Sequence, residues 1–158
     1  MTEPSFEKLL VRLAEAGIQF IVVGGVAVTL QGYVRLTDDV DLLLENSPDN
    51  IRLFIHSLTD YGEGFARDLT VDDFTDEEGA IRIVEEVESC QIDAFTVMAG
   101  LHYGDIIADA DFFIIGDQRI AVASKAALIR WKAPSLRDKD RLDAMALREL
   151  LENPRAFD

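Results

Sequence analysis

Two aspartates separated by one residue, Asp39 and Asp41, stand at the start of an apolar run that predicts a β-strand over 40–45. On a strand, side chains two residues apart point to the same face, about 7 Å apart along the chain. Two carboxylates held together raise each other's pKa unless a positive charge lies between them. Mg²⁺ binds one or two carboxylates and keeps coordination positions for substrate phosphates. The pair therefore predicts a site for Mg²⁺ or Mn²⁺.

A third carboxylate and a glycine pair extend this prediction. Asp93 stands alone in the apolar run 90–97, where an acid is costly unless it is paired or binds a metal. Gly24 and Gly25 end a β-rich run and lead into a short helix. Backbone N–H groups at such a turn bind anions, and glycine lets a phosphate approach closely. Phosphates beside metal ions predict phosphoryl or nucleotidyl transfer, in which one metal lowers the pKa of the attacking hydroxyl and the other stabilises the leaving pyrophosphate.

The elements that must position these residues mix helical and strand periodicity. Helices are predicted over 4–16, 26–33, 49–60, 124–133 and 135–153, and strands over 18–25, 40–45, 80–87, 90–97 and, as a hairpin, 112–122. Segment 100–110 favours a short helix or an ordered loop, and 61–79 shows no pattern beyond one helical turn at 71–74. We expect one α/β domain over 1–158, with a mixed sheet, flanking helices and a C-terminal helical segment at about 124–153.

Composition restricts the partners. The chain has 158 residues, of which 49% are hydrophobic and 28% charged, as in an ordinary globular protein. Its net charge of −15 argues against an extended nucleic-acid surface, although a local basic patch is compatible with it. The sequence shows no cluster of basic residues. With no apolar run of about 18 residues and no signal peptide, we expect a cytoplasmic protein without a membrane partner.

The stretch VGGVAVTLQGYVRLTDDVDLLLE, from Val22 to Glu45, resembles the signature of the nucleotidyltransferase superfamily that shares the DNA polymerase β fold. Its Arg35-to-Asp41 part is most similar to small bacterial nucleotidyltransferases, including the abortive-infection toxin type and lincosamide-resistance enzymes. The later stretch SKAALIRWKAPSLRDKDRLDAMAL resembles the C-terminal segment of the same enzymes. The resemblance runs from Phe20 to about Leu151.

The resemblance implies a role for each candidate residue. Gly24 and Gly25 would hold the triphosphate of an NTP, Asp39 and Asp41 the metals, and Asp93 the metal and the position of the hydroxyl-activating base. The remaining candidates for the nucleotide or acceptor side are Arg35, Thr37, Lys132, Lys139 and Asp140.

Each candidate has a plainer interpretation. Gly24 and Gly25 could only form a turn, and Arg35 could be a surface base or could neutralise the carboxylates and position Thr37. Lysines near helix ends interact favourably with the helix dipole without binding any ligand. Asp38 is expected to be a solvated loop acid.

We therefore expect a metal-dependent nucleotidyltransferase that moves NMP from an NTP to a hydroxyl of an unknown acceptor. The alternative is an inactive nucleotide- or metal-binding module of the same fold, with a partner protein as in a toxin–antitoxin pair. An acidic protein-interaction surface and a nuclease are further alternatives, the last disfavoured because a nuclease groove needs basic residues.

Overall fold

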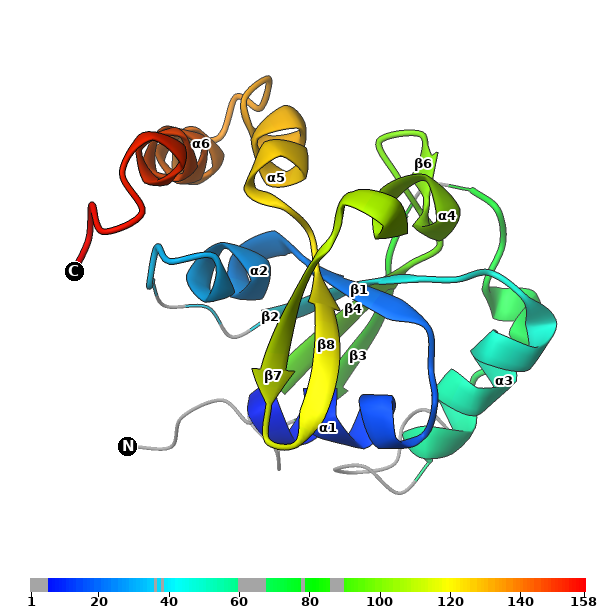
Figure 1. The fold of residues 1–158 in the computed structure, drawn as a ribbon. Helices are drawn as coiled ribbons and strands as arrows, with labels where there is room; N and C mark the ends of the chain where they lie inside the picture. The colour runs from blue at the N-terminus through cyan, green and yellow to red at the C-terminus, as the bar shows by residue number, and fades with distance from the viewer. Residues whose placement is uncertain (1–5, 36, 38, 60–67, 78, 86–89) are drawn as a thin grey trace.

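The computed structural model describes residues 6–35, 37, 39–59, 68–77, 79–85 and 90–158. Within this part of the chain a mixed sheet has the strand order β3-β4-β2-β1-β8-β7, and a second, small sheet pairs β5 with β6 (Figure 1). The strands of the large sheet are β1 (Phe20–Val23), β2 (Asp39–Leu44), β3 (Ile81–Glu85), β4 (Cys90–Phe95), β7 (Asp111–Ile115) and β8 (Gln118–Val122). The small sheet consists of β5 (Val97–Met98) and β6 (Leu101–His102).

Helices flank the large sheet, which confirms the predicted α/β class. They are α1 (Phe6–Glu15), α2 (Gly24–Leu30), α3 (Pro48–Ser57), α4 (Tyr103–Ile106), α5 (Lys125–Lys132) and α6 (Asp138–Glu152), with 3₁₀ turns η2 (Val71–Asp73) and η3 (Ile107–Asp109). In the described part of the chain no helix has both the length and the apolar character needed to cross a membrane.

Strand β1 lies inside the sheet, and all four of its residues are buried. It pairs antiparallel with β2 and parallel with β8. On β2 the residues alternate: Val40 and Leu42 are fully buried, whereas Asp39 and Asp41 are only partly buried on the opposite face. The same strand thus contributes apolar side chains to the core and carboxylates to the other side, as its period of two requires.

Local sequence signals explain where two of the helices begin. The hydroxyl of Ser47 accepts a hydrogen bond from the backbone N–H of Asn50 at 3.2 Å, and Pro48 occupies the first turn of α3. Ser124 caps α5 in the same way, accepting from the N–H of Ala127 at 3.1 Å. Serine is among the residues preferred at a helix N-cap, so the sequence itself indicates where both helices begin.

The C-terminal helices α5 and α6 pack against each other, and α5 also contacts α2 (Figure 1). Pro134 lies between them, where its missing N–H and its ring interrupt a continuous helix. The inner face of α6 is apolar except at one position, Asp143. This arrangement brings the C-terminal segment to the turn between β1 and α2.

The structure differs from the predicted elements mainly after Asp93. The strand predicted over 90–97 ends at Phe95, and the chain then forms the hairpin β5–β6. Ala99 and Gly100 reverse the chain there with φ of 50° and 76°. The turn at 71–74 is confirmed as η2. The strands predicted over 80–87 and 90–97 imply a hairpin turn around Glu88-Ser89, and this turn and Asp38 lie outside the described residues.

Candidate active site

The three aspartates meet on adjacent strands. Asp39 and Asp41 share one face of β2, and Asp41 lies directly opposite Asp93 in the parallel pairing of β2 with β4. The same register places Val23, the last residue of β1, opposite Asp41. The sheet itself therefore brings the three carboxylates together.

The charge of Asp41 is poorly compensated by the protein. Burial raises the pKa of its carboxyl to about 7, and the nearby charges of Asp93 and Asp39 and a hydrogen bond with Asp93 act in the same direction. The positive charge of Lys132 opposes this shift without cancelling it. An additional cation at this place would favour the ionised form of Asp41.

Asp93 is 6% exposed and is paired across the hairpin. The Nε of Arg82, on β3, donates to Asp93 Oδ1 at 3.0 Å, and Gln91 Nε2 donates to Oδ2 at 3.4 Å. The Arg82 side chain is 61% exposed, so this ion pair is accessible from solvent. The buried acid thus has the partner that its burial requires.

The two glycines permit close approach of the neighbouring segments. Gly24 has φ of 68°, and a Cβ built there would collide with the Asp41 carboxylate and lie 2.8 Å from its Cγ. A Cβ at Gly25 would lie 3.0 Å from Arg35 Nη2 and 3.1 Å from Thr37 Oγ1. Both glycines therefore have a packing role, which is compatible with the predicted binding of phosphate.

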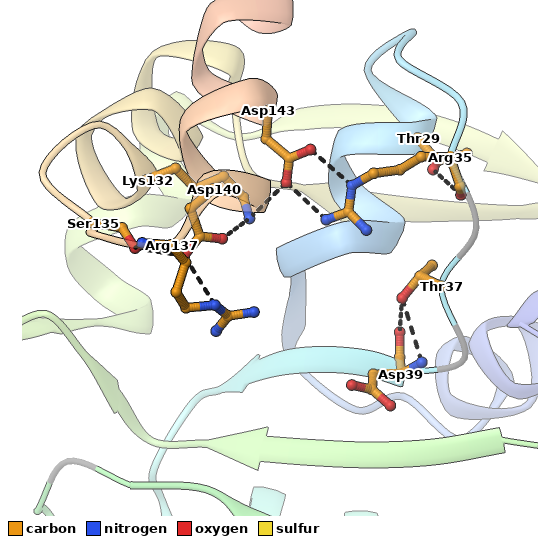
Figure 2. A network of polar contacts seen from close by, with 9 residues as sticks. All are labelled: Thr29, Arg35, Thr37, Asp39, Lys132, Ser135, Arg137, Asp140 and Asp143. Atoms are coloured by element: carbon orange, nitrogen blue, oxygen red, sulfur yellow. Dashed lines mark hydrogen bonds and ion pairs between the residues drawn. The ribbon is translucent and has the colours of Figure 1, made fainter.

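Thr37 and Asp39 form a local turn at the entrance to β2 (Figure 2). The Thr37 hydroxyl donates to the carbonyl oxygen of Asp39 at 3.3 Å, and the N–H of Asp39 donates to Thr37 Oγ1 at 3.4 Å. These contacts fix how the chain enters the strand that carries the two carboxylates.

A second group of charges joins three segments (Figure 2). Arg35 donates to both carboxylate oxygens of Asp143, from Nε to Oδ1 and from Nη2 to Oδ2, each at 2.7 Å. Lys132 Nζ lies 3.0 Å from Asp143 Oδ2 and 3.2 Å from Asp140 Oδ1. Arg35 thus makes a two-point ion pair with a carboxylate of α6.

Asp140 is held at the start of α6 by several donors. The Ser135 hydroxyl donates to Asp140 at 2.8 Å, and Arg137 Nε lies 3.6 Å from it. Burial would raise the pKa of Asp140, but hydrogen bonds from Ser135 and Lys132 and the charges of Lys132 and Arg137 outweigh burial and lower it. This carboxyl therefore stays ionised at neutral pH.

Most of these groups line one cleft of about 470 Å³. Every predicted site residue is in its lining: Gly24, Gly25, Arg35, Thr37, Asp39, Asp41, Asp93, Lys132, Lys139 and Asp140. The apolar part of the lining includes Phe95, Met98, Leu128 and Trp131. The structure thus brings together residues that are up to 116 positions apart in the sequence, from Gly24 to Asp140.

Basic residues gather in the folded chain, contrary to what we expect from the sequence. Five of the 15 basic residues line this cleft: Arg35, Arg82, Lys132, Arg137 and Lys139. Lys132, Arg137 and Lys139 lie within eight positions of the sequence, and folding adds Arg35 and Arg82 from distant segments. Cations that face carboxylates across one cleft suit a ligand that combines anionic phosphate with metal.

The carboxylates of the cleft suit a divalent cation that a substrate helps to bind. Among the described residues, no three His, Cys, Asp or Glu side chains form a ready-made metal cage. Mg²⁺ does not need one, because it usually keeps several waters and takes one or two carboxylates together with substrate phosphates. The oxygen-only donor set and the poorly compensated Asp41 fit such a cation.

Three charged residues of the site were not among the predicted ones: Arg82 and Arg137 line the cleft, and Asp143 is not part of the lining but contacts Arg35 and Lys132. A predicted turn centred on Glu88-Ser89 would place Asp93 opposite Val84, whereas the observed register places it opposite Arg82. The sequence therefore gave no reason to select Arg82. Asp143 has no distinguishing local pattern, and only its position on the buried face of α6 could have indicated it.

The fold of the chain is similar to that of a solved adenylyltransferase. The lincosamide antibiotic adenylyltransferase LnuA, solved with lincomycin bound, is similar over 95% of this chain and 99% of that one, with a TM-score of 0.65 and 17% identity. An antigenic nucleotidyltransferase-like protein from Paracoccidioides brasiliensis aligns over 91% of this chain and 73% of that chain, with a TM-score of 0.49 and 14% identity. The first likeness shows a shared fold. No curated protein matches the chain in sequence.

The family comparison is more specific and confirms the predicted class of enzyme. Residues 3–155, nearly the whole chain, match the family described as "Nucleotidyl transferase of unknown function (DUF2204)". The chain belongs to this nucleotidyltransferase family.

Proposed function

We propose that the protein transfers NMP from an NTP to a hydroxyl group of an acceptor, and that Asp39, Asp41 and Asp93 hold the divalent cations this reaction uses. The observation that carries the proposal is the meeting of three carboxylates from two adjacent strands in a cleft that also contains five cationic side chains. Phosphoryl transfer depends mainly on positioning and on stabilisation of charge, and this lining offers both.

The residues divide into two sides of the cleft. The backbone at Gly24 and Gly25, with Arg35 and Lys132 near it, binds the phosphate chain. Lys139 is exposed at the cleft and has no ion pair among the described residues, so its charge is available to an anion. The carboxylates of β2 and β4 face the α-phosphate and the acceptor hydroxyl.

The chemistry is a single displacement. The acceptor oxygen forms a bond to the α-phosphorus, the bond from that phosphorus to the bridging oxygen breaks, and pyrophosphate leaves. The hydroxyl proton passes to a carboxylate of the cluster, for which Asp93 is the candidate. When bound, Mg²⁺ or Mn²⁺ lowers the pKa of the hydroxyl and stabilises charge on the leaving group.

The acceptor remains to be identified by experiment, and small hydroxyl compounds are the first class to test. The name of LnuA specifies a lincosamide antibiotic as its substrate, but a shared fold does not transfer a substrate. The net charge of −15 weighs against a long RNA acceptor.

The test combines binding and transfer. Purified protein is incubated with each α-labelled NTP, Mg²⁺ or Mn²⁺ and a panel of hydroxyl acceptors that includes lincomycin, and labelled products are identified by mass spectrometry. Wild type and Asp117→Asn, a control on the exposed β7–β8 turn, should transfer label, whereas Asp41→Asn should not. Metal-dependent NTP binding without transfer to any acceptor would instead favour the binding-module alternative.

A further inference from the structure

Asp143 is a fully buried carboxylate that the proposed reaction does not use directly. Its side chain is 0% exposed on the inner face of α6. A buried charge is costly unless it is paired and hydrogen-bonded, and removal of its partners leaves it uncompensated. Asp143 meets this requirement with two cations, Arg35 and Lys132, from different parts of the chain.

Both cations reach Asp143 from the cleft side. Arg35 belongs to the segment between α2 and β2, and Lys132 is the last residue of α5. Their side chains are 15% and 11% exposed, and both residues line the cleft together with Gly25. Asp143 lies behind them and is not part of the lining.

The geometry at Arg35 is more specific than charge neutralisation requires. Nε and Nη2 contact the two oxygens of Asp143, so the plane of the guanidinium is fixed by two parallel hydrogen bonds. In this orientation the terminal nitrogens Nη2 and Nη1 lie 3.0 and 3.1 Å from the position that a Cβ on Gly25 would occupy. The guanidinium therefore faces the glycine turn at the start of α2 (Figure 2).

We propose that Asp143 is a positioning residue, which holds the Arg35 guanidinium and the Lys132 ammonium at the wall of the cleft so that both face a bound phosphate chain. The proposal rests on the proposed function, because it assigns Asp143 to the phosphate side of the same site. A purely structural alternative exists, in which the ion pairs only fasten α6 to the remainder of the protein.

The two interpretations differ in what they predict for the folded protein. If Asp143 positions the cations, its loss lowers the affinity of the folded protein for phosphate chains. If it only fastens α6, its loss lowers the melting temperature and leaves the affinity of the folded protein unchanged. Binding to the folded protein therefore discriminates between them.

The experiment measures binding of inorganic tripolyphosphate and of Mg–ATP by calorimetry, at a temperature where circular dichroism shows each variant to be folded. The variants are Asp143→Asn and, as the matched control, Asp138→Asn. Asp138 is an exposed acid in the first turn of the same helix, paired with Arg141 at 2.9 Å and outside the cleft lining. We expect Asp143→Asn to weaken tripolyphosphate binding roughly tenfold or more, as for lost hydrogen bonds to charged groups, and Asp138→Asn to leave it unchanged.

A second variant keeps the proposal testable if Asp143→Asn does not fold. Arg35→Lys keeps the charge beside Asp143 but loses the two-point contact, because an ammonium is a point charge. We expect it to fold, to bind tripolyphosphate more weakly, and to raise KM for the NTP by a larger factor than it lowers kcat. Wild-type affinity in folded Asp143→Asn, or in Arg35→Lys if the first variant is unfolded, would overturn the positioning role. A wild-type protein that binds neither tripolyphosphate nor Mg–ATP would overturn the proposed function itself.

Discussion

Asp41 on β2 lies directly opposite Asp93 on β4, so two carboxylates occupy neighbouring positions of a parallel ladder. Like charges at such positions destabilise a sheet unless something compensates them. Arg82 compensates Asp93, whereas Asp41 responds with a raised pKa. The two strands therefore hold a repulsion between carboxylates that a bound cation would relieve.

The stability of the metal-free protein should fall as the pH rises from about 4 to about 7. The pKa of Asp41 is raised from 3.8 to about 7, so between these values the folded state binds a proton that the unfolded chain releases. The contribution of Asp41 is thus fully present below the lower value and is lost as the pH passes the upper one, at up to about 1.4 kcal/mol per pH unit. Urea unfolding in EDTA at pH 5 and pH 7.5 measures this loss.

Asp41→Asn isolates this contribution, because the side chain of asparagine does not titrate between about pH 4 and about pH 8. The variant should lose less stability than the wild type between the two pH values and should be more stable than the wild type at pH 7.5. Asp49→Asn, an exposed acid on α3, should follow the wild type. Parallel profiles for wild type and Asp41→Asn would contradict the raised pKa.

Mg²⁺ with an NTP should raise the melting temperature of the wild type at pH 7.5. A ligand at about 100 times its Kd adds roughly 2.7 kcal/mol, which corresponds to roughly 5–10 °C for a chain of this size. The shift should require both metal and nucleotide, and it should be absent in Asp41→Asn. A shift of equal size in Asp41→Asn would show that Asp41 does not bind the metal.

Gly24→Ala should damage the site more than Gly17→Ala, although both glycines have a positive φ. Gly17 has φ of 80° and open space around the position of a Cβ, so alanine there carries only the cost of backbone conformation, roughly 1 kcal/mol. Gly24 has φ of 68° and its Cβ would also collide with Asp41. We expect Gly24→Ala to unfold at lower urea concentration than Gly17→Ala and to lose NMP transfer, whereas Gly17→Ala keeps it. Equal effects would show that the contact with Asp41 is unimportant.

Arg82→Gln should strengthen the binding of Mn²⁺ to the nucleotide-free protein. Without the guanidinium at 3.0 Å from Asp93, the carboxylate cluster has one more uncompensated negative charge. Arg52→Gln is a close control, since Arg52 is 63% exposed and pairs with Asp49 at 2.9 Å, away from the cleft. Calorimetric titration with Mn²⁺ compares the three proteins. Weaker binding in Arg82→Gln than in Arg52→Gln would show that Arg82 supports the cluster instead of competing with the cation.

The sequence was sufficient to predict the elements around the carboxylates, because their signals are local. Alternation at Asp39 and Asp41 predicts which face of β2 each residue occupies, and the caps at Ser47 and Ser124 mark where α3 and α5 begin. The proximity of these elements to Asp93 came instead from a family resemblance.

The contacts that the sequence could not predict depend on the register of the β3–β4 hairpin and on the packing of α6. Arg82 meets Asp93 because of a hairpin register that a shift of two residues in the turn would change. Asp143 meets Arg35 because α6 docks with one particular face inward, across 108 residues of sequence. Propensity and periodicity carry no information on either distance, since both are set by packing between distant segments.

The charge of the cleft lining differs in sign from the charge of the remainder of the chain. Five cations and four carboxylates give the cleft lining a formal charge of +1, so the remainder of the chain carries −16. At physiological ionic strength charges are screened beyond about 8 Å, so a ligand experiences the cleft cations only once it has entered. We expect a short anion that arrives with its counter-cation to be repelled little, whereas a long polyanion must place its remaining phosphates outside the cleft, near a chain of net negative charge. We therefore expect the cleft to bind short anions better than long ones, and we expect added salt to reduce the repulsion outside the cleft while it weakens the attraction within.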